Sequence, residues 1–227
     1  MKRYIAFVMA AAVVFSLAAC GSDKREVSGS PEQAREETAS ENAEPASDGK
    51  ILIAYFTAAE NSGVDAVSSA SYSMVNDKAV GRLRAIADMI QAETGGELFS
   101  IRTSVVYPSD GGELIDYAAK EQEEDARPEL TNHIEGLDEY GTIFVGFPNW
   151  WADLPQVLYS FFDEYDFSGK TIIPFNVHNG SRFSGTIETI QELEPEATVI
   201  TDGFTVNERD VSEAADDVAD WLEGIGY

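Results

Sequence analysis

Continuous apolar runs alternate with segments of helical periodicity along this chain from residue 50 onward. Unbroken apolar runs predict buried strands at 51–56, 98–101, 142–147, 171–176 and 197–206. Apolar residues spaced three and four apart predict helices at 80–95, 114–124, 154–165, 187–193 and 210–225. Because the strands are apolar on both faces and alternate with helices, we expect an α/β domain with a parallel sheet covered by helices.

Two details refine these elements. Asp153 to Gln156 has the form of a capping box with Pro155 in the first turn, which predicts a helix start at Leu154. Pro174 lies inside an apolar strand, where a residue without an N–H cannot donate to the sheet ladder.

The first twenty residues have the pattern of a signal sequence. Lys2 and Arg3 precede an apolar run over 4–17, which is too short to span a bilayer and ends in small residues before Cys20. The segment resembles a bacterial lipoprotein signal, in which residues 1–19 are removed and Cys20 is lipidated at its sulfur. The alternative is an ordinary secretory signal with an incidental cysteine.

Residues 20–49 are expected to form a lipidated Cys20 followed by an acidic, disordered tether, ahead of a folded domain at 50–227. The segment is rich in Ser, Glu, Ala and Pro and contains no aromatic residue, so it cannot bury enough apolar surface to fold. A coil of this length spans roughly 30 Å. We therefore expect an extracytoplasmic domain anchored to the membrane of a bacterium.

The charge balance excludes several classes of function. The 227 residues include 15 Lys and Arg against 41 Asp and Glu, a net charge of −26. We expect no nucleic-acid partner and no polybasic lipid contact, since both need a basic surface. One cysteine and two histidines give no disulfide and no cysteine-rich or histidine-rich metal site.

Three loops follow predicted strands at the edge where parallel sheets bind ligands. The loop after Phe147 contains Pro148, Asn149, Trp150, Trp151 and Ala152. Adjacent tryptophans in such a loop favour a wall for a flat aromatic ligand. The alternative is that both rings pack over the helix at 154–165 as part of the core.

The other two loops offer polar groups. The loop after Asn176 contains His178, Asn179, Gly180, Ser181 and Phe183, whose glycine lets backbone approach a ligand closely. The loop after Phe56 begins with Thr57 and Ala58 and extends for some twenty residues, far longer than usual, which indicates either a functional or a mobile loop. Its hydroxyls and amides, ahead of a helix, are typical of a phosphate site.

Taken together, these segments resemble the flavodoxin family. The matching pieces are Ile51 to Thr57, Ala126-Arg127-Pro128, Leu137 to Tyr140, Phe147-Pro148-Asn149-Trp150-Trp151, Tyr165 to Phe175, and His178-Asn179-Gly180-Ser181. The resemblance implies a doubly wound sheet of five parallel strands in the order 2-1-3-4-5, with helices on both faces. It also implies one non-covalent FMN.

The resemblance implies where FMN would bind. The ring system would lie between the Pro148–Ala152 loop and the 178–183 loop. The phosphate would lie at Thr57, Ala58 and the helix start at Gly81, Arg82 and Leu83. This chain departs from the family there, because no Thr-Gly-Asn-Thr sequence follows Thr57. Backbone amides, the helix dipole and the Arg82 cation would replace the missing hydroxyls, with a weaker hold on FMN.

Three functions follow from the sequence. The first is an FMN electron-transfer protein outside the cytoplasmic membrane, with basic redox proteins as partners and the acidic run Glu121, Glu123, Glu124 and Asp125 as a docking surface. The alternative is that these acidic residues only keep the surface soluble. The second is an FMN-dependent reductase of quinone-like acceptors, fed by a separate donor because no Gly-x-Gly-x-x-Gly fingerprint is present. The third is a flavodoxin-fold surface lipoprotein that has lost FMN and binds another ligand or partner.

Overall fold

The computed structural model describes residues 49–61, 72–75 and 78–227. The predicted signal peptide, Cys20 and the tether up to residue 48 lie outside these described residues. Within them, no helix has both the length and the apolar character needed to cross a membrane.

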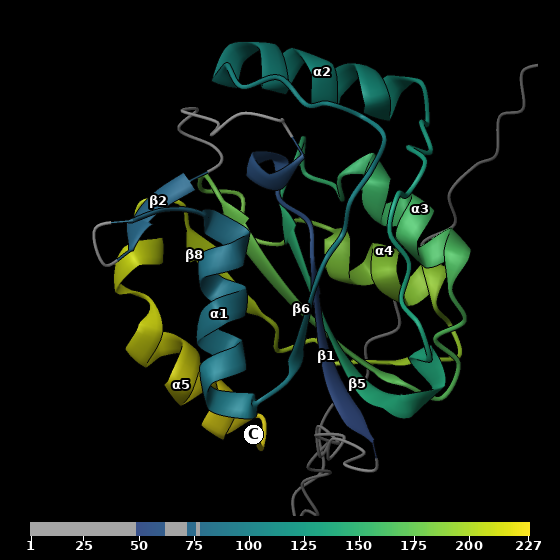
Figure 1. Ribbon diagram of the computed structural model, residues 1–227, viewed down its shortest axis with the longest axis vertical. Helices are drawn as coiled ribbons and strands as arrows, with labels where there is room; N and C mark the ends of the chain where they lie inside the picture. Colours follow the sequence, from purple (N-terminus) through teal and green to yellow (C-terminus); the bar gives the residue numbers. More distant parts are fainter. Residues whose placement is uncertain (1–48, 62–71, 76–77) are drawn as a thin grey trace, which may run out of the picture. The chain divides into compact units, whose positions relative to one another are not determined.

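The elements follow the predicted alternation (Figure 1). The main sheet contains β1 (Lys50–Tyr55), β4 (Glu97–Ser100), β5 (Tyr140–Pro148), β6 (Thr171–His178), β7 (Thr198–Val199) and β8 (Phe204–Asn207). The helices are α1 (Arg82–Thr94), α2 (Gly111–Glu123), α3 (Gln156–Glu164), α4 (Thr186–Leu193) and α5 (Ala215–Gly224). Short 3₁₀ turns are η1 (Ala58–Glu60), η2 (Leu137–Glu139) and η3 (Val211–Glu213).

The sheet confirms the predicted topology. Its order is β4-β1-β5-β6, with β7 and β8 both pairing with β6, and every pair is parallel. Counting β7 and β8 together as the fifth strand, this is the order 2-1-3-4-5. Alternate residues of β1 enter two separate cores: Leu52 and Ala54 pack with α2, α3 and α4, while Ile53 and Tyr55 pack with α1 and α5.

The fifth strand, predicted as continuous over 197–206, is interrupted between β7 and β8. The carbonyl of Ile172 accepts a hydrogen bond from the Ile200 N–H at 2.9 Å, so Pro174, two residues further along β6, also faces the fifth strand. Pro174 has no N–H to donate, and the chain bulges between β7 and β8. A Cβ added to Gly203 in this bulge would lie 2.5 Å from the Pro174 carbonyl oxygen, so the bulge requires glycine.

Two other predictions are corrected. The capping box at 153–156 does not form: α3 begins at Gln156, and its N-cap, Pro155, makes no side-chain cap bond. Asp153 instead accepts hydrogen bonds from the Leu154 N–H at 2.7 Å and the Tyr159 hydroxyl at 3.0 Å. The long loop after Thr57 also contains secondary structure, because β2 (Tyr72–Val75) and β3 (Lys78–Gly81) pair as an antiparallel ribbon ahead of α1.

Candidate functional site

The three predicted loops meet at one edge of the sheet, where β1, β5 and β6 end. The Phe56 N–H donates to the Gly146 carbonyl at 2.9 Å, and the Asn149 N–H donates to the Val177 carbonyl at 3.0 Å. The start of α1 lies against the first loop, since a Cβ added to Gly81 would be 3.0 Å from the Thr57 Oγ1. Parallel strands therefore bring residues far apart in sequence to a common edge.

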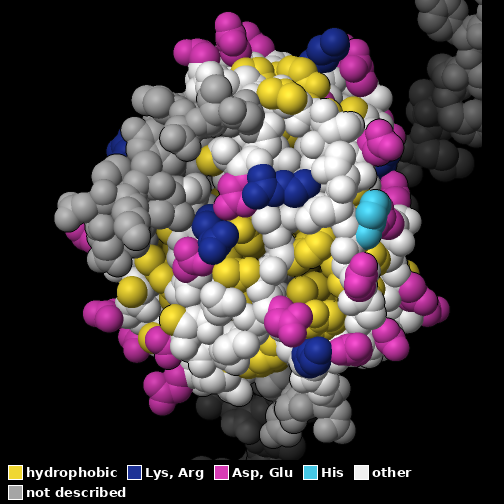
Figure 2. Space-filling model, viewed as in Figure 1, with side chains coloured by type: hydrophobic (Ala, Val, Ile, Leu, Met, Phe, Trp, Pro, Cys, Tyr) yellow, Lys and Arg dark blue, Asp and Glu magenta, His cyan; other side chains and the backbone are white. Residues whose placement is uncertain are grey.

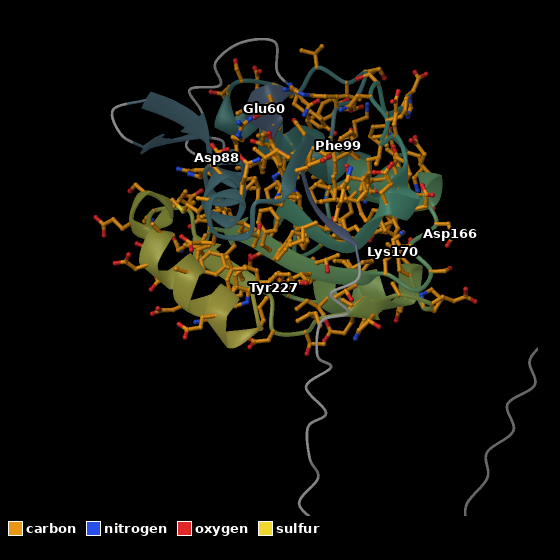
Figure 3. All side chains as sticks on the ribbon, turned by 60° about the horizontal axis from the view of Figure 1, so that its bottom comes forward. Glu60, Asp88, Phe99, Asp166, Lys170 and Tyr227 are labelled. Carbon is orange, nitrogen blue, oxygen red and sulfur yellow. The ribbon has the colours of Figure 1, made fainter. Side chains whose placement is uncertain are left out.

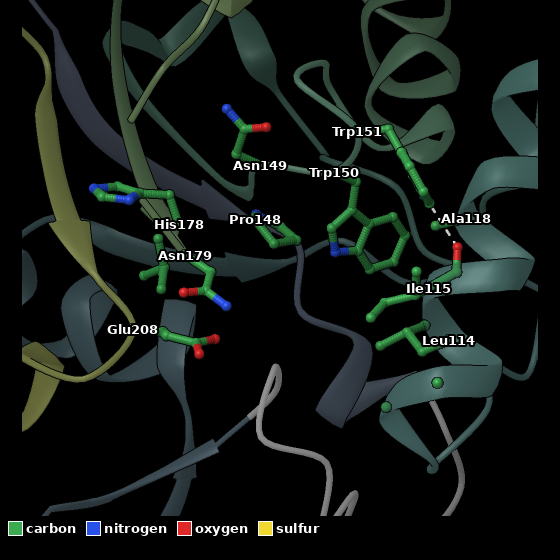
Figure 4. Close-up of a pocket in the computed structure, with 13 residues that line it drawn as sticks. Leu114, Ile115, Ala118, Pro148, Asn149, Trp150, Trp151, His178, Asn179 and Glu208 are labelled. Atoms are coloured by element: carbon green, nitrogen blue, oxygen red, sulfur yellow. Dashed lines mark hydrogen bonds between the residues drawn. The ribbon is translucent and has the colours of Figure 1, made fainter. Parts of the chain in front are cut away.

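A cavity of about 650 Å³ opens at this edge (Figure 4). This volume falls within the range of small-molecule sites. The loop after β5 and the end of β6 form two of its sides, and the first turns of α2 form a third. Its described lining residues are Gly111, Gly112, Leu114, Ile115, Ala118, Pro148, Asn149, Trp150, Trp151, Val177, His178, Asn179 and Glu208.

The tryptophan loop is a tight, strained turn. Trp150 and Asp153 exchange two backbone hydrogen bonds, of 3.1 and 3.0 Å. The two residues between them, Trp151 and Ala152, have φ of 52° and 64°, as in a type I′ turn. Neither is glycine, so each left-handed residue costs about 1–2 kcal/mol. Such strain persists where the surrounding structure holds it, which is common at binding sites.

The two indole rings differ in environment. Trp150 packs edge-on against Phe56 and Tyr107, with ring centroids 5.5 and 5.6 Å apart. Trp151 is 56% exposed, and its Nε1–H donates to the Ile115 carbonyl of α2 at 3.0 Å. The alternative that both rings belong to the core is therefore wrong. Both line the cavity, and Figure 4 shows the Trp150 indole nitrogen turned towards it.

The loop after β6 is held in place by amide side chains. The Nδ2 groups of Asn149 and Asn176 both donate to the Arg182 carbonyl, at 2.6 and 2.9 Å, which joins this loop to the tryptophan loop. The Nδ1 of His178 accepts the Gly180 N–H at 2.8 Å, so the neutral ring carries its proton on Nε2. Burial and the Arg182 cation lower the pKa of His178, which favours this neutral form.

The first loop is fixed by Glu60, which Figure 3 labels. Its carboxylate accepts hydrogen bonds from Ser100 Oγ at 2.6 Å and Arg102 Nη2 at 2.9 Å, and from the Tyr55 hydroxyl at 3.3 Å. These partners lie at the carboxyl ends of β1 and β4. Glu60 therefore stabilises this corner of the fold and is not among the described residues that line the cavity.

The structure divides the fifteen predicted cofactor residues into groups. Six line the cavity: Pro148, Asn149, Trp150, Trp151, His178 and Asn179. Ala152, Gly180 and Ser181 are exposed in the same loops. Phe183 packs on Phe147, with ring centroids 6.3 Å apart, and so supports the loop from behind.

The residues expected to hold phosphate are not among the described cavity-lining residues. Thr57 and Ala58 are buried, and the Leu83 side chain belongs to the core, so only its backbone amide is left for a ligand. Gly81 is the N-cap of α1. Arg82 Nη1 forms an ion pair with Glu208 Oε2 at 3.0 Å, so its charge already has a carboxylate partner.

Sequence reasoning missed the α2 wall and Glu208. Leu114, Ile115 and Ala118 line the cavity from α2, where Leu114 and Ala118 belong to the buried face of the helix and Ile115 does not. Ile115 is 52% exposed. A large apolar residue next to the buried face of α2 was the one feature of the sequence that could have indicated this wall. Glu208 directly follows β8, and no local pattern in the sequence marks it as a site residue.

The residues present fit the ring system of a flavin. The walls are apolar and aromatic, and a few polar groups lie among them, as in cofactor sites. The Asn149 Oδ1 is buried with no hydrogen-bond partner among the described residues, which leaves an acceptor for a ligand N–H at this wall. Within the same described part of the chain, no cluster of His, Cys, Asp and Glu could hold a metal ion.

Comparisons with known proteins agree with this geometry. The flavodoxin family model matches residues 74–225. A candidate flavoprotein from Bacteroides uniformis is 26% identical, with a TM-score of 0.59 over 77% of this chain and 98% of that one. One from Bacteroides eggerthii is 23% identical, with a TM-score of 0.58 over 79% and 99%.

A third structure, a flavoprotein from Lactobacillus acidophilus in complex with FMN, is 16% identical, with a TM-score of 0.52 over 75% of this chain and 99% of that one. At 16% identity, the similarity between this chain and the Lactobacillus acidophilus protein shows a shared fold and nothing further. No curated protein gives a significant match to the sequence.

Proposed function

The chain belongs to the flavodoxin family, and on that premise we propose that it binds one FMN non-covalently and transfers electrons between redox partners. The observation that supports this most strongly is the cavity between the tryptophan loop and the end of β6. Its position, at the carboxyl ends of adjacent parallel strands, is where doubly wound sheets bind ligands.

Bound FMN would supply the one- and two-electron chemistry, and the chain would bind, orient and shield it. Trp150 and Trp151 offer apolar area for the ring and exclude water from one side. Asn149 offers a carbonyl oxygen, and His178 in its neutral form carries an N–H on Nε2. The net charge of −26 opposes further negative charge on a bound cofactor and so lowers its reduction potential.

We also propose that the domain is tethered outside the cytoplasmic membrane through a lipidated Cys20 and a disordered segment up to residue 49. The sequence pattern at 1–20 supports this. The domain would then meet its partners close to the membrane surface.

The partners we propose are basic redox proteins. Large apolar side chains are strongly exposed at Val106, Ile115 and Trp151, and Ile115 and Trp151 are joined by a hydrogen bond at the cavity rim. Figure 2 shows hydrophobic atoms over α2 with Asp and Glu side chains beside them. Within the predicted acidic run, however, Glu121 is only 6% exposed, so it cannot contribute to docking.

FMN titration of the full-length chain in detergent tests the proposal. We expect quenching of flavin fluorescence on binding, and at least about fivefold weaker binding for Trp151→Ala, because aromatic contacts contribute about 1 kcal/mol each beyond buried area. Trp151→Phe is the matched control and should keep most of the affinity. A chain that does not quench FMN fluorescence at all would refute the flavin proposal.

A second candidate is the FMN-dependent reductase. The α2 wall favours it, since Leu114, Ile115 and Ala118 extend the cavity beyond the loops expected to hold the ring. An apolar, quinone-like acceptor could bind there. Steady two-electron turnover of a quinone would support the reductase, while transfer of single electrons to a protein partner would support the carrier.

A further inference from the structure

One buried ion pair lies where the phosphate of FMN was expected. Arg82 is the first residue of α1, and Glu208 follows β8. Their side chains are only 10% and 16% exposed, and the charged atoms are 3.0 Å apart. Figure 4 shows the Glu208 carboxylate beside Asn179, and of the pair it is Glu208 that lines the cavity.

The start of α1 lacks an anion of its own. Its N-cap, Gly81, makes no side-chain cap bond, and its first turn contains no acidic residue. The first backbone amides of a helix and the helix dipole both favour a negative group at the N-terminus. A cation such as Arg82 at this position favours it further. In this structure Glu208, from another part of the chain, supplies a negative group to the Arg82 guanidinium.

Glu208 is firmly placed. Its backbone N–H donates to the His178 carbonyl at 2.8 Å, which ties the residue to the end of β6. The turn that follows is closed by Asn207, whose carbonyl accepts the Asp210 N–H at 2.9 Å and whose Oδ1 accepts the Arg209 N–H at 3.1 Å. The carboxylate is therefore held by its backbone as well as by Arg82.

We propose that Glu208 determines how this site treats phosphorylated flavins, by occupying Arg82 and lowering the affinity for a phosphate group. The inference rests on the proposed flavin site. A phosphate at the start of α1 would find the Arg82 charge neutralised and would meet a second anion. Because the pair is largely buried, water and salt screen this repulsion only weakly.

The wild-type chain gives the first test. FMN and riboflavin share the ring and the ribityl chain and differ in the phosphate. The proposal predicts that the full-length chain binds FMN less than about a hundredfold more tightly than riboflavin, because the phosphate adds little. A preference for FMN above that value would overturn the proposal while leaving the flavin site intact. Binding of neither flavin would overturn both.

Variants at Glu208 give the second test. Glu208→Gln keeps an oxygen that can accept from Arg82 but removes the negative charge. We expect about tenfold or greater tightening for FMN and little change for riboflavin. Glu208→Asp keeps the charge and should resemble the wild type. Glu223→Gln, on the exposed side of α5, removes one charge far from the pair and serves as the control.

The ratio of the FMN and riboflavin dissociation constants distinguishes an effect of Glu208 on the phosphate from a purely structural role of Glu208 in its loop. If Glu208→Gln changes FMN and riboflavin affinity equally, or weakens FMN, then Glu208 only supports the loop and the proposal is wrong. Circular dichroism shows whether Glu208→Gln is folded. If it is not, the proposal is tested by the ratio of the riboflavin and FMN dissociation constants in the wild type and in Glu208→Asp.

Discussion

Replacing Glu121 with Gln is expected to stabilise the fold above pH 7. Glu121 lies on the inward side of α2 and is only 6% exposed. Its carboxylate oxygens accept from the Tyr107 hydroxyl at 3.3 and 3.4 Å, and Tyr107 in turn packs on Trp150. Burial raises the pKa of Glu121 from 4.5 to about 7, against the opposing effect of the Tyr107 hydrogen bond.

The magnitude follows from proton linkage. Between pH 4.5 and about 7 the folded chain keeps a proton on Glu121 that the unfolded chain has lost. The native state then binds more protons, so the free energy of unfolding falls as pH rises through this window. Across the interval from pH 4.5 to about 7, the wild-type chain loses about 3 kcal/mol of its free energy of unfolding, at 1.36 kcal/mol per pH unit, and this loss is complete by pH 8.

Urea unfolding at pH 5 and pH 8 measures the effect. We expect Glu121→Gln to exceed the wild type by about 2–3 kcal/mol at pH 8 and by much less at pH 5, since Gln stays neutral throughout. Glu123→Gln, exposed on the same helix, should follow the wild type. Glu194 also has a raised pKa of about 7, and its contribution cancels in this comparison. Parallel pH profiles for wild type and Glu121→Gln would refute the reasoning.

Three further outcomes are expected. Gly146→Ala should destabilise the fold by about 3 kcal/mol, because the new Cβ would lie 2.2 Å from the Phe175 Cζ. Gly224→Ala, in α5 with open space around it, should not lower the melting temperature. Equal melting temperatures for Gly146→Ala and the wild type would contradict this. Trp150→Ala should cost about 3 kcal/mol in denaturant unfolding through lost ring packing, and an unaltered midpoint would argue against it. Cys20→Ser should move the chain from the membrane to the soluble fraction; a variant that remains with the membrane would disprove lipid anchoring at Cys20.

The sheet was predictable because its strands are continuous apolar runs. Double-sided burial of β1 and β5 follows directly from their composition, and the parallel order followed from the family resemblance. The break between β7 and β8 does not follow from the sequence, although Pro174 shows that β6 lacks one backbone donor. A missing N–H is a local property, but its consequence appears in a partner strand distant in sequence.

The site was predictable only where its residues follow strands. Trp150, Trp151 and His178 were identified by type and position, and they do line the cavity. Ile115 and Glu208 come from elements whose orientation depends on tertiary packing, so no local pattern placed them there. The role of Arg82 was also beyond the sequence, because its partner lies 126 residues away.

The visible absorption spectrum of the purified full-length chain, before and after addition of FMN, tests the central claim most directly. A yellow protein with quenched flavin fluorescence and one FMN per chain is the predicted result. A colourless protein whose spectrum equals that of protein plus free FMN would contradict the account, and the cavity would then belong to another ligand.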